Sequence, residues 1–232
     1  MKKRIAVFTG AGVSADSGLA TFRDSDGLWA NYRIEDVCTP EALARDRRKV
    51  IEFYNMRRRE MYAALPNAGH RAIAELEHCF EVDVVTQNVD NLHERAGSSR
   101  VLHLHGELTR LCSSRDKECV FELEGCEQSE DMKAPDGTPA RPYIVFFGES
   151  VPLFDEAVRI VERADIMVVA GTSLSVYPAA SLVRYAGREI PVYLVDPGSP
   201  DVSGVRNLAA HIPLRGAEGL PMLAEMLRAK YL

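Results

Sequence analysis

The sequence, 232 residues long, has no apolar run near the roughly 18–20 residues of a membrane-spanning helix. Its apolar opening at residues 5–8 is too short for a signal peptide. Basic blocks are missing as well. Lys and Arg total 28 against 34 Asp and Glu, a net charge of -6, which leaves no electrostatic footprint for nucleic acid. We therefore expect a cytoplasmic protein whose partners include neither nucleic acid nor a membrane.

Cysteine is scarce and follows no pairing pattern. The five cysteines stand at positions 38, 79, 112, 119 and 126, an odd number at irregular spacings. This usage fits reduced thiols better than a disulfide framework. Internal repeats and low-complexity tracts are also absent, and 46% of the residues are hydrophobic. These features exclude disordered and fibrous classes and suit one large domain, or a core domain carrying a small insertion.

Short apolar, β-branched runs alternate with helical patterns along the chain. The runs predicted as strands are residues 4–9, 82–86, 101–104, 143–147, 166–170 and 192–195. The stretches predicted as helices are residues 40–65, 68–77, 153–163, 178–186 and 218–230. Near-continuous apolar strands are typical of a parallel sheet covered on both faces. The pattern therefore predicts an α/β fold with a doubly wound, Rossmann-like parallel sheet.

Two segments interrupt this alternation. Residues 34–79 carry helical patterns without a strand, and residues 109–142 are polar, charged and rich in turn residues. We expect these two segments to form a smaller inserted module, helical and irregular. The sheet domain would then consist of residues 1–33, 80–108 and 143–232.

The first predicted strand ends in a glycine-rich loop, TGAGVSA at residues 9–15. Such glycines let the backbone approach a phosphate, which the N–H groups of a following helix can bind. Alone the loop is a weak signal, because a tight strand-to-helix turn uses the same residues. A nicotinamide-dependent dehydrogenase would add an acid after its second strand, about 20 residues on. Residues 29–36 follow no strand, and SGLATFRD at residues 17–24 indicates a lid over a ligand.

Three further loops each follow a predicted strand, at the edge where open α/β sheets place their ligands. They read QNVDNLH at residues 87–93, HLHG at 103–106 and GTSLSVYPAA at 171–180. Together with GAGVSADSGLATFR at 10–23 and RPYIVFFGE at 141–149, they resemble the sirtuin family of NAD-dependent protein lysine deacylases. The match covers essentially the whole chain. Within the family, the chain resembles the class III bacterial sirtuins, which are desuccinylase- and demalonylase-like.

The resemblance implies that the sheet domain binds NAD as a co-substrate. The first glycine loop would hold the pyrophosphate, the second the ribose side, and the lid would cover the nicotinamide ribose. Asn88 and Asp90 suit the carboxamide of nicotinamide, although Asp90 fits a helix N-cap about as well. Asp196 stands where the family has an Asn at the adenosine ribose. The residues implied to contact NAD are Gly10, Ala11, Gly12, Ser14, Phe22, Arg23, Gln87, Asn88, Asp90, Gly171, Thr172, Ser173, Asp196 and Ala217.

His105 matches the general base of the family. It precedes a glycine at a strand end, and imidazole titrates nearest to neutral pH. His103 would face the same side of an extended strand, but the His-Gly pair favours His105. In the implied reaction nicotinamide leaves, the acyl-lysine oxygen captures the ribose, and His105 deprotonates a ribose hydroxyl. The products are free lysine and O-acyl-ADP-ribose.

Tyr54 and Arg57 are three residues apart on a predicted helix, so both project from one face. Tyr-x-x-Arg resembles the subclass that binds the distal carboxylate of succinyl- or malonyl-lysine, and an arginine fork matches a carboxylate. Without the family, a solvated basic face would be the plain alternative. Cys38 stands where the subclass tends to have Ala, so we expect a narrower pocket that also takes acetyl-lysine. The residues implied to contact the substrate are Tyr54, Arg57, Phe147, Gly148, Glu149 and Val176.

Many sirtuins carry a structural zinc, but the paired ligands of such a site are missing here. A tetrahedral site needs four N or S ligands, typically in two close pairs. Cys112 is followed by Ser113 and Ser114, and Cys119 and Cys126 are seven apart. We expect no metal, unless the three thiols recruit an unidentified fourth ligand.

Three other functions stay open at this point. The chain could act as a deacetylase only, as a nicotinamide-dependent dehydrogenase, or as an NAD or ADP-ribose sensor without catalysis. His105 argues against the sensor, because a protein that only binds needs no base at that strand end.

Overall fold

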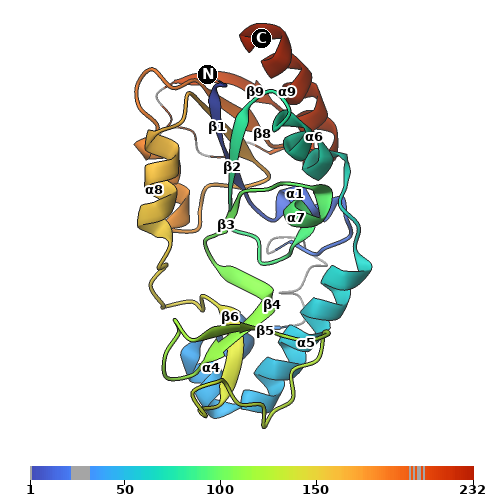
Figure 1. Cartoon of the computed structure of the whole chain (residues 1–232), viewed down its shortest axis with the longest axis vertical. Coiled ribbons are helices and arrows are strands. Elements are labelled where there is room, and N and C mark those ends of the chain that lie inside the picture. The colour runs from blue at the N-terminus through green and yellow to red at the C-terminus, as the bar shows by residue number, and fades with distance from the viewer. Residues whose placement is uncertain (1, 22–31, 199, 201, 203–204, 206) are drawn as a thin grey trace.

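A six-stranded parallel sheet forms the larger part of the molecule. The computed structural model describes residues 2–21, 32–198, 200, 202, 205 and 207–232. The sheet has the order β3-β2-β1-β7-β8-β9. Its strands are β1 (Arg4–Thr9), β2 (Glu81–Thr86), β3 (Val101–His103), β7 (Ile166–Ala170), β8 (Val192–Val195) and β9 (Leu208–Ile212). Every neighbouring pair is parallel, which confirms the expected doubly wound fold (Figure 1).

Helices cover both faces of this sheet. Along β1, Ile5 and Val7 face one apolar core, while Ala6 and Phe8 face the other. The first core is closed by α6 (Ala68–Leu76) and α9 (Gly216–Tyr231), and the second by α8 (Phe154–Glu162) and the 3-10 helix η1 (Ala179–Tyr185). Figure 1 shows α6 and α9 to the right of the sheet and α8 to its left. Full burial of an Ile, Val or Phe contributes about 1.5–3 kcal/mol, so this double cover explains the near-continuous apolar strands.

The strand order reverses between β1 and β7, and this reversal locates the ligand crevice. In doubly wound sheets the connections diverge at such a point, which leaves a crevice outside the carboxyl ends of the two strands. Thr9 and Ala170, the last residues of β1 and β7, are partners in the register. The glycine loop that contains α1 (Gly12–Ala15) and the loop at residues 171–178 therefore start side by side.

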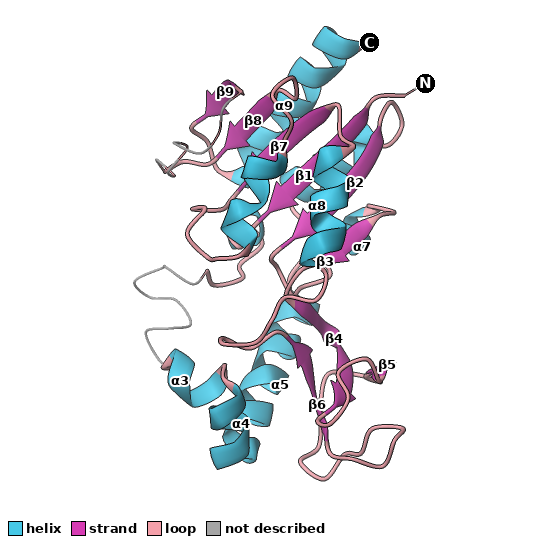
Figure 2. Ribbon diagram, turned by 90° about the vertical axis from the view of Figure 1, so that its left-hand side faces the viewer, coloured by secondary structure: helices cyan, strands magenta, loops and turns pink. Residues whose placement is uncertain are grey.

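A smaller module lies beneath the parallel sheet in Figure 2. Its antiparallel sheet has three strands in the order β5-β4-β6. They are β4 (Gly106–Ser113), β5 (Val120–Glu122) and β6 (Ala140–Ile144). Beside them stand α3 (Ile34–Val37), α4 (Pro40–Arg45) and α5 (Arg47–Ala63). Val50 and Phe53 of α5 pack with Leu108 of β4 and with Phe146, so helices and sheet share one core.

The structure corrects several predicted elements. The strand predicted at residues 143–147 in the parallel sheet is wrong, because β6 ends at Ile144 and pairs antiparallel with β4. The module is not irregular between residues 109 and 142, since β4 and β5 lie there, and β9 occupies a stretch where no strand was predicted. The helix predicted at residues 40–65 is two helices. Asp46 ends α4 and caps α5 by accepting a hydrogen bond from the Lys49 N–H at 3.0 Å.

Helix α6 belongs to the core of the parallel sheet. Ala72, Ile73 and Leu76 lie in the apolar core that α9 closes. This packing differs from the expectation that residues 34–79 belong to the small module throughout. We propose that the first segment of the module ends before α6, and that α6 is part of the sheet domain.

Candidate active site

The two glycine loops pack on each other through their backbones. The Gly10 N–H donates to the Ala170 carbonyl at 3.1 Å, and the Gly12 N–H donates to the Gly171 carbonyl at 2.9 Å. A Cβ at Gly10 or Gly12 would come within 2.8 Å of atoms in the second loop. At Gly171, where φ is +59°, a Cβ would lie 2.3 Å from the Val13 nitrogen. Glycine is required here for the packing of the two loops on each other.

Ser14 of α1 joins the first glycine loop to the loop at residues 87–91. Its Oγ donates to Asp90 Oδ2 at 3.0 Å and accepts from Asn88 Nδ2 at 3.1 Å. All three side chains are buried. Asp90 Oδ1 also accepts from the Leu92 N–H at 3.1 Å, but the N-cap residue of α7 (Leu92–Ala96) is Asn91, so the N-cap role weighed for Asp90 from the sequence is wrong. Burial raises the pKa of Asp90, although the Leu92 N–H and the Ser14 hydroxyl oppose that rise.

His70 of α6 is a member of this cluster that sequence reasoning missed. Its Nε2 lies 3.4 Å from Ser14 Oγ, and its Nδ1 accepts from the Asn67 N–H at 3.3 Å, so Nε2 carries the hydrogen. Burial lowers the pKa of His70 to about 4, which keeps the ring neutral at pH 7. The sequence signal is the Asn-x-x-His spacing of a capping box. That spacing marks the start of a helix, but it does not indicate Ser14 as a neighbour.

His105 lies in the turn between β3 and β4. Its Nδ1 is 3.1 Å from the Gln87 carbonyl, so Nδ1 donates and Nε2 keeps its lone pair. Burial lowers the pKa of His105, and the bond to Gln87 opposes that shift only in part. The ring is therefore neutral at pH 7 with an acceptor nitrogen left over, which is the form that a general base requires.

Gln87 also connects this turn to the second glycine loop. Its Nε2 donates to Thr172 Oγ1 at 3.0 Å, and the same oxygen accepts from the Leu174 N–H at 3.3 Å. Ser173 Oγ lies 3.0 Å from Ser175 Oγ within the loop. Hydrogen bonds thus link residues 14, 88 and 90 in one network and residues 87, 105 and 172 in a second network.

Two other predicted NAD contacts make hydrogen bonds outside these two networks. Asp196 follows β8, and its Oδ1 accepts from the Gly198 N–H at 2.8 Å. The Ala217 N–H, in the first turn of α9, donates to Asp16 Oδ2 at 3.3 Å. Ala11 is the N-cap residue of α1, and Phe22 and Arg23 lie outside the described residues.

Tyr54 is buried in the small module beside Cys38. Its hydroxyl lies 3.4 Å from Cys38 Sγ, and its ring stacks on Phe146 with centroids 5.9 Å apart. Burial raises the pKa of Tyr54 well above its ordinary value, so the phenol keeps its proton. Burial likewise raises the pKa of the Cys38 thiol to about 11. Both groups therefore remain neutral hydrogen-bond partners at physiological pH.

The three consecutive arginines of α5 have three different environments. The Arg57 side chain is 13% exposed, and its Nε lies 3.8 Å from Glu60 Oε2. Arg58 is fully buried and donates to the Leu108 carbonyl at 2.7 Å, and burial lowers its pKa to about 10. Arg59 is half exposed and pairs with Glu127. A solvated basic face, the alternative weighed from the sequence, does not describe this set.

The loop at residues 146–149 is held in place by ion pairs. Glu149 is nearly buried, and its Oε1 lies 2.8 Å from both Arg141 Nη1 and Lys117 Nζ. The Phe147 N–H donates to the Cys38 carbonyl at 2.9 Å, while the Phe147 side chain is 43% exposed. Val176, in the second glycine loop, is 41% exposed. Phe147 and Val176 thus leave apolar surface open, whereas the carboxylate of Glu149 is occupied by the chain itself.

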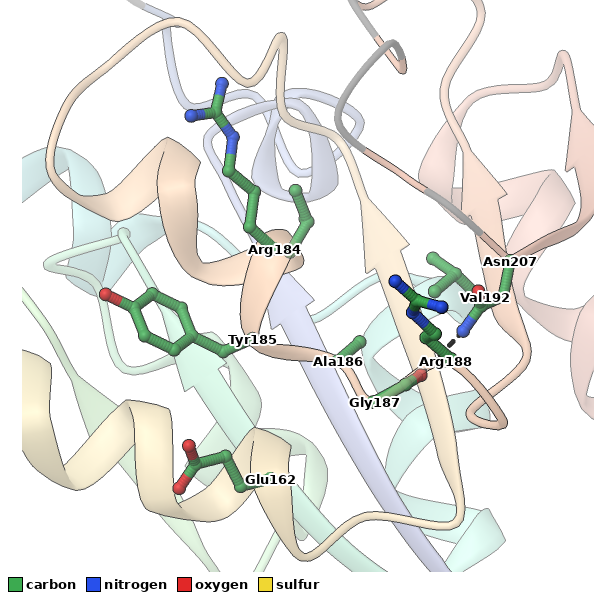
Figure 3. Close-up of a pocket in the computed structure, with 9 residues that line it drawn as sticks. Glu162, Arg184, Tyr185, Ala186, Gly187, Arg188, Val192 and Asn207 are labelled. Carbon is green, nitrogen blue, oxygen red and sulfur yellow. Dashed lines mark hydrogen bonds between the residues drawn. The ribbon is translucent and has the colours of Figure 1, made fainter.

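A cavity of about 340 Å³ lies elsewhere, between α8, η1 and the start of β8. Figure 3 shows Glu162 and Tyr185 on one side of it and Arg188 and Asn207 on the other. Arg184 points away from Glu162 in this view. Val192 opens β8, so this cavity sits at the amino edge of the sheet, opposite the glycine loops.

The described part of the chain contains neither a metal-binding cluster nor a membrane-spanning helix. In residues 2–21, 32–198, 200, 202, 205 and 207–232, no group of three or more His, Cys, Asp or Glu side chains could hold a metal ion. Within the same ranges no helix is long and apolar enough to cross a bilayer. Cys112 is buried, while Cys119 and Cys126 are partly exposed, and all three are free thiols.

Known proteins show the same sequence pattern and the same fold. The sequence model of the Sir2 family matches residues 10–178. The chain belongs to the Sir2 family. A Sir2-family relative from Bacteroides thetaiotaomicron, named NAD-dependent protein deacylase, is 53% identical over 231 residues, which cover 97% of this chain and 98% of the relative. A relative of the same name from Helicobacter pylori is 46% identical over 91% of this chain and 88% of its own.

Solved Sir2 structures superpose closely on this chain. A Sir2 homologue in complex with NAD has a TM-score of 0.86 at 38% identity, covering 98% of this chain and 90% of its own. A mutant Sir2 homologue with ADP-ribose reaches a TM-score of 0.89 at 38% identity, over 98% of this chain and 93% of its own. Family membership confirms the resemblance seen in the sequence and separates the chain from the dehydrogenases.

Proposed function

We propose that this chain removes succinyl and malonyl groups from protein lysines, and that it also accepts acetyl-lysine. It is an NAD-dependent protein deacylase of the Sir2 family, like the relatives that it matches. Acyl-lysine proteins or peptides are its substrates, and its products are nicotinamide and O-acyl-ADP-ribose. The free cysteines fit a cytoplasmic location.

The position of Arg57 carries the proposed acyl preference. Burial raises the pKa of Tyr54, of Cys38 and of Asp90, and the charge of Arg57 opposes the rise at all three. This cation therefore acts both on the buried side chains of Tyr54 and Cys38 and on the cluster around Ser14. A carboxylate at the end of an acyl chain would meet a guanidinium fork and a phenol there.

The crevice between β1 and β7 fits NAD as the co-substrate. Helix α1 has no acidic residue in its first turn, so no negative side chain would repel a phosphate at the positive end of its dipole. Asn88 and Asp90 offer the amide and the carboxylate that a carboxamide needs, and Thr172 and Ser173 offer hydroxyls to a ribose. NAD supplies the ribose hydroxyl that accepts the acyl group and the nicotinamide that leaves.

His105 is the proposed general base. Its Nδ1 is committed to the Gln87 carbonyl, so Nε2 is the nitrogen that accepts a proton from the ribose hydroxyl. On the substrate side, Phe147, Gly148 and Val176 would contact an extended peptide. Because its carboxylate is paired with Arg141 and Lys117, Glu149 would position this loop.

A panel of matched peptides tests this function. The protein is incubated with NAD and with succinyl-, malonyl- or acetyl-lysine versions of one peptide, and products are identified by mass spectrometry. Free nicotinamide and O-acyl-ADP-ribose are expected in every case, with the highest kcat/KM for the acidic acyl groups. A higher kcat/KM for acetyl-lysine than for the acidic acyl groups would contradict the proposed preference and favour a function as a deacetylase only. ADP-ribose binding without turnover would indicate a sensor.

Substitution of Arg57 tests how the acyl group is recognised. Arg57→Met should reduce desuccinylation more than deacetylation, by a differential of about 1.5–3 kcal/mol for a lost charge-assisted hydrogen bond. Arg59→Met is the matched control, since Arg59 lies two residues away on the same helix and pairs with Glu127 at the surface. Equal losses on both substrates would mean that Arg57 does not bind the carboxylate.

A further inference from the structure

His103, the last residue of β3, and His105, in the turn after it, bond to two consecutive carbonyls. His103 Nδ1 lies 2.8 Å from the Asn88 carbonyl, and His105 Nδ1 lies 3.1 Å from the Gln87 carbonyl. Both carbonyls belong to the loop whose side chains line the crevice. This loop is thus attached twice to the segment that carries the proposed base.

The second nitrogen of each ring has a different environment. His103 Nε2 lies 2.7 Å from Glu94 Oε1 of α7, and the His103 side chain is only 5% exposed. A carbonyl and a carboxylate can only accept, so both ring nitrogens of His103 must donate. A histidine with two donors is an imidazolium. His105 instead uses one nitrogen as a donor and keeps the other for accepting a proton.

The electrostatics agree with this geometry. Burial disfavours a charged ring at His103, but the hydrogen bond and the charge of Glu94 outweigh it and raise the pKa of His103. Burial also works against the charge on Glu94, and His103 in turn lowers the pKa of that carboxyl. At His105, burial prevails and lowers the pKa. Two neighbouring histidines with pKa values shifted in opposite directions lose their protons at different pH, His105 before His103.

Other groups also face this ion pair. The groups whose charge acts on His103 or Glu94, or on which His103 acts, are Asp90, His93, Glu107 and Arg110. His93 is buried, and its pKa falls well below the ordinary value, so it adds no charge. Glu107 pairs with Arg110 at 3.0 Å, which leaves Glu94 as the direct counter-ion of His103.

We propose that His103 is a positioning residue for deacylation: as an imidazolium held by Glu94, it fixes the Asn88 carbonyl and with it the loop that orients His105. A neutral His103 has one N–H and can keep only one of its two bonds. Loss of this proton at alkaline pH therefore releases either the loop or α7. The inference rests on His105 as the base of the proposed function.

The pH profile of kcat tests this role. Wild-type deacetylation of an acetyl-lysine peptide, at saturating NAD, should rise as His105 loses its proton and fall as His103 loses its own. Glu94→Gln keeps the shape and the acceptor oxygen but removes the charge, so the falling limb should move down by about one pH unit or more. The rising limb should stay in place. Glu107→Gln is the control, and its falling limb should move much less.

A falling limb at the same pH in the wild type and in Glu94→Gln would overturn the proposal. Nitrogen NMR of the wild-type ring tests it without relying on a variant that has to fold. At pH 7 His103 should show the imidazolium pattern, while His105 shows a neutral ring with hydrogen on Nδ1. A neutral His103 in a protein that still releases nicotinamide would refute this inference alone. No nicotinamide release at all would refute the proposed function, whatever the state of His103.

Discussion

Gly171 holds a backbone conformation that other residues avoid, at the junction of the two glycine loops. Its φ is +59°, and a Cβ there would lie 2.3 Å from the Val13 nitrogen. Gly171→Ala should therefore push the loops apart, at a cost of about 1–3 kcal/mol in the free energy of unfolding, and weaken NAD binding. Thermal unfolding and calorimetric titration with NAD measure both effects.

Gly137→Ala separates the effect of the backbone conformation from the effect of the contact between the loops. Gly137 has a φ of +79° in the small module, and no atom lies within 4 Å of its Cβ position. This variant should lose some stability to backbone conformation but keep its affinity for NAD. If Gly171→Ala binds NAD as tightly as Gly137→Ala does, contact between the loops does not shape the binding site.

Removal of the His105 side chain should separate catalysis from binding. His105→Ala is expected to lower deacylation by on the order of 10²–10⁴-fold, the usual scale for a positioned base. NAD binding should stay largely intact, because the glycine loops and the Ser14 cluster remain. His78 is an exposed histidine, and His78→Ala serves as the control. Near-normal turnover of His105→Ala would remove this histidine from the mechanism.

Candidate site residues within one short loop could be predicted from the sequence. Contacts between residues far apart in the sequence could not. His105, Gly10 and Gly171 each stand at the end of an apolar strand, where the fold places ligands. The contact of His70 with Ser14 joins residues 56 positions apart. The hydrogen bond that His103 donates to Glu94 depends on how α7 lies against β3, and no spacing in the sequence indicates it.

Among the elements, the end of β6 and the loop after it depend on one buried ion pair. The side chains of Arg141 and Glu149 are 5% and 7% exposed, and Glu149 also accepts from the Phe146 N–H at 2.9 Å. Glu149→Gln would leave Arg141 buried without its counter-ion, which should cost about 3 kcal/mol of stability and weaken peptide binding. Glu122→Gln removes a more exposed partner of Arg110, and less than about 1 kcal/mol should be lost.

The same pair predicts a dependence on pH. Burial opposes the charge on Glu149, but the bonds from Arg141 and Lys117 prevail and lower its pKa below the ordinary value of 4.5. The pair therefore stabilises the fold above that value, and the stabilisation is lost as pH falls through the lowered pKa. Urea unfolding at several pH values should show Glu149→Gln and the wild type converging in acid. A gap that stays constant down to acid pH would contradict this assignment.

Elements buried on both faces were the easiest to predict. Strands β1, β7 and β8 read as unbroken apolar runs, and their predicted bounds agree with the structure. Strand β9 is largely exposed, so its sequence LAAHI carries little apolar pattern. The run at residues 143–147 is apolar because Phe146 packs against α5, and an apolar pattern does not specify which sheet or core it joins.

At the scale of the whole molecule, polar bonds hold together the part of the module where many family members carry zinc. Ser113 Oγ donates to Asp136 Oδ2 at 2.8 Å and lies 2.7 Å from Thr138 Oγ1. We predict that the untagged protein contains less than stoichiometric zinc and that a chelator leaves its Tm unchanged. Elemental analysis and thermal unfolding with EDTA measure this. One zinc per chain, with a Tm that falls on chelation, would show that the three thiols recruit a fourth ligand.

The central place of β1 in the sheet affects the order in which the molecule assembles during translation. β1 leaves the ribosome before the two strands with which it pairs. One of its edges stays unpaired until β2 is made, and the other until β7, which begins at Ile166. Until then one edge exposes unpaired N–H and C=O groups that can pair with the wrong strand. The crevice does not exist before Gly171 has been added. A nascent chain therefore cannot gain stability from NAD binding while most of it is being made, and its open strand edge is not protected in that way.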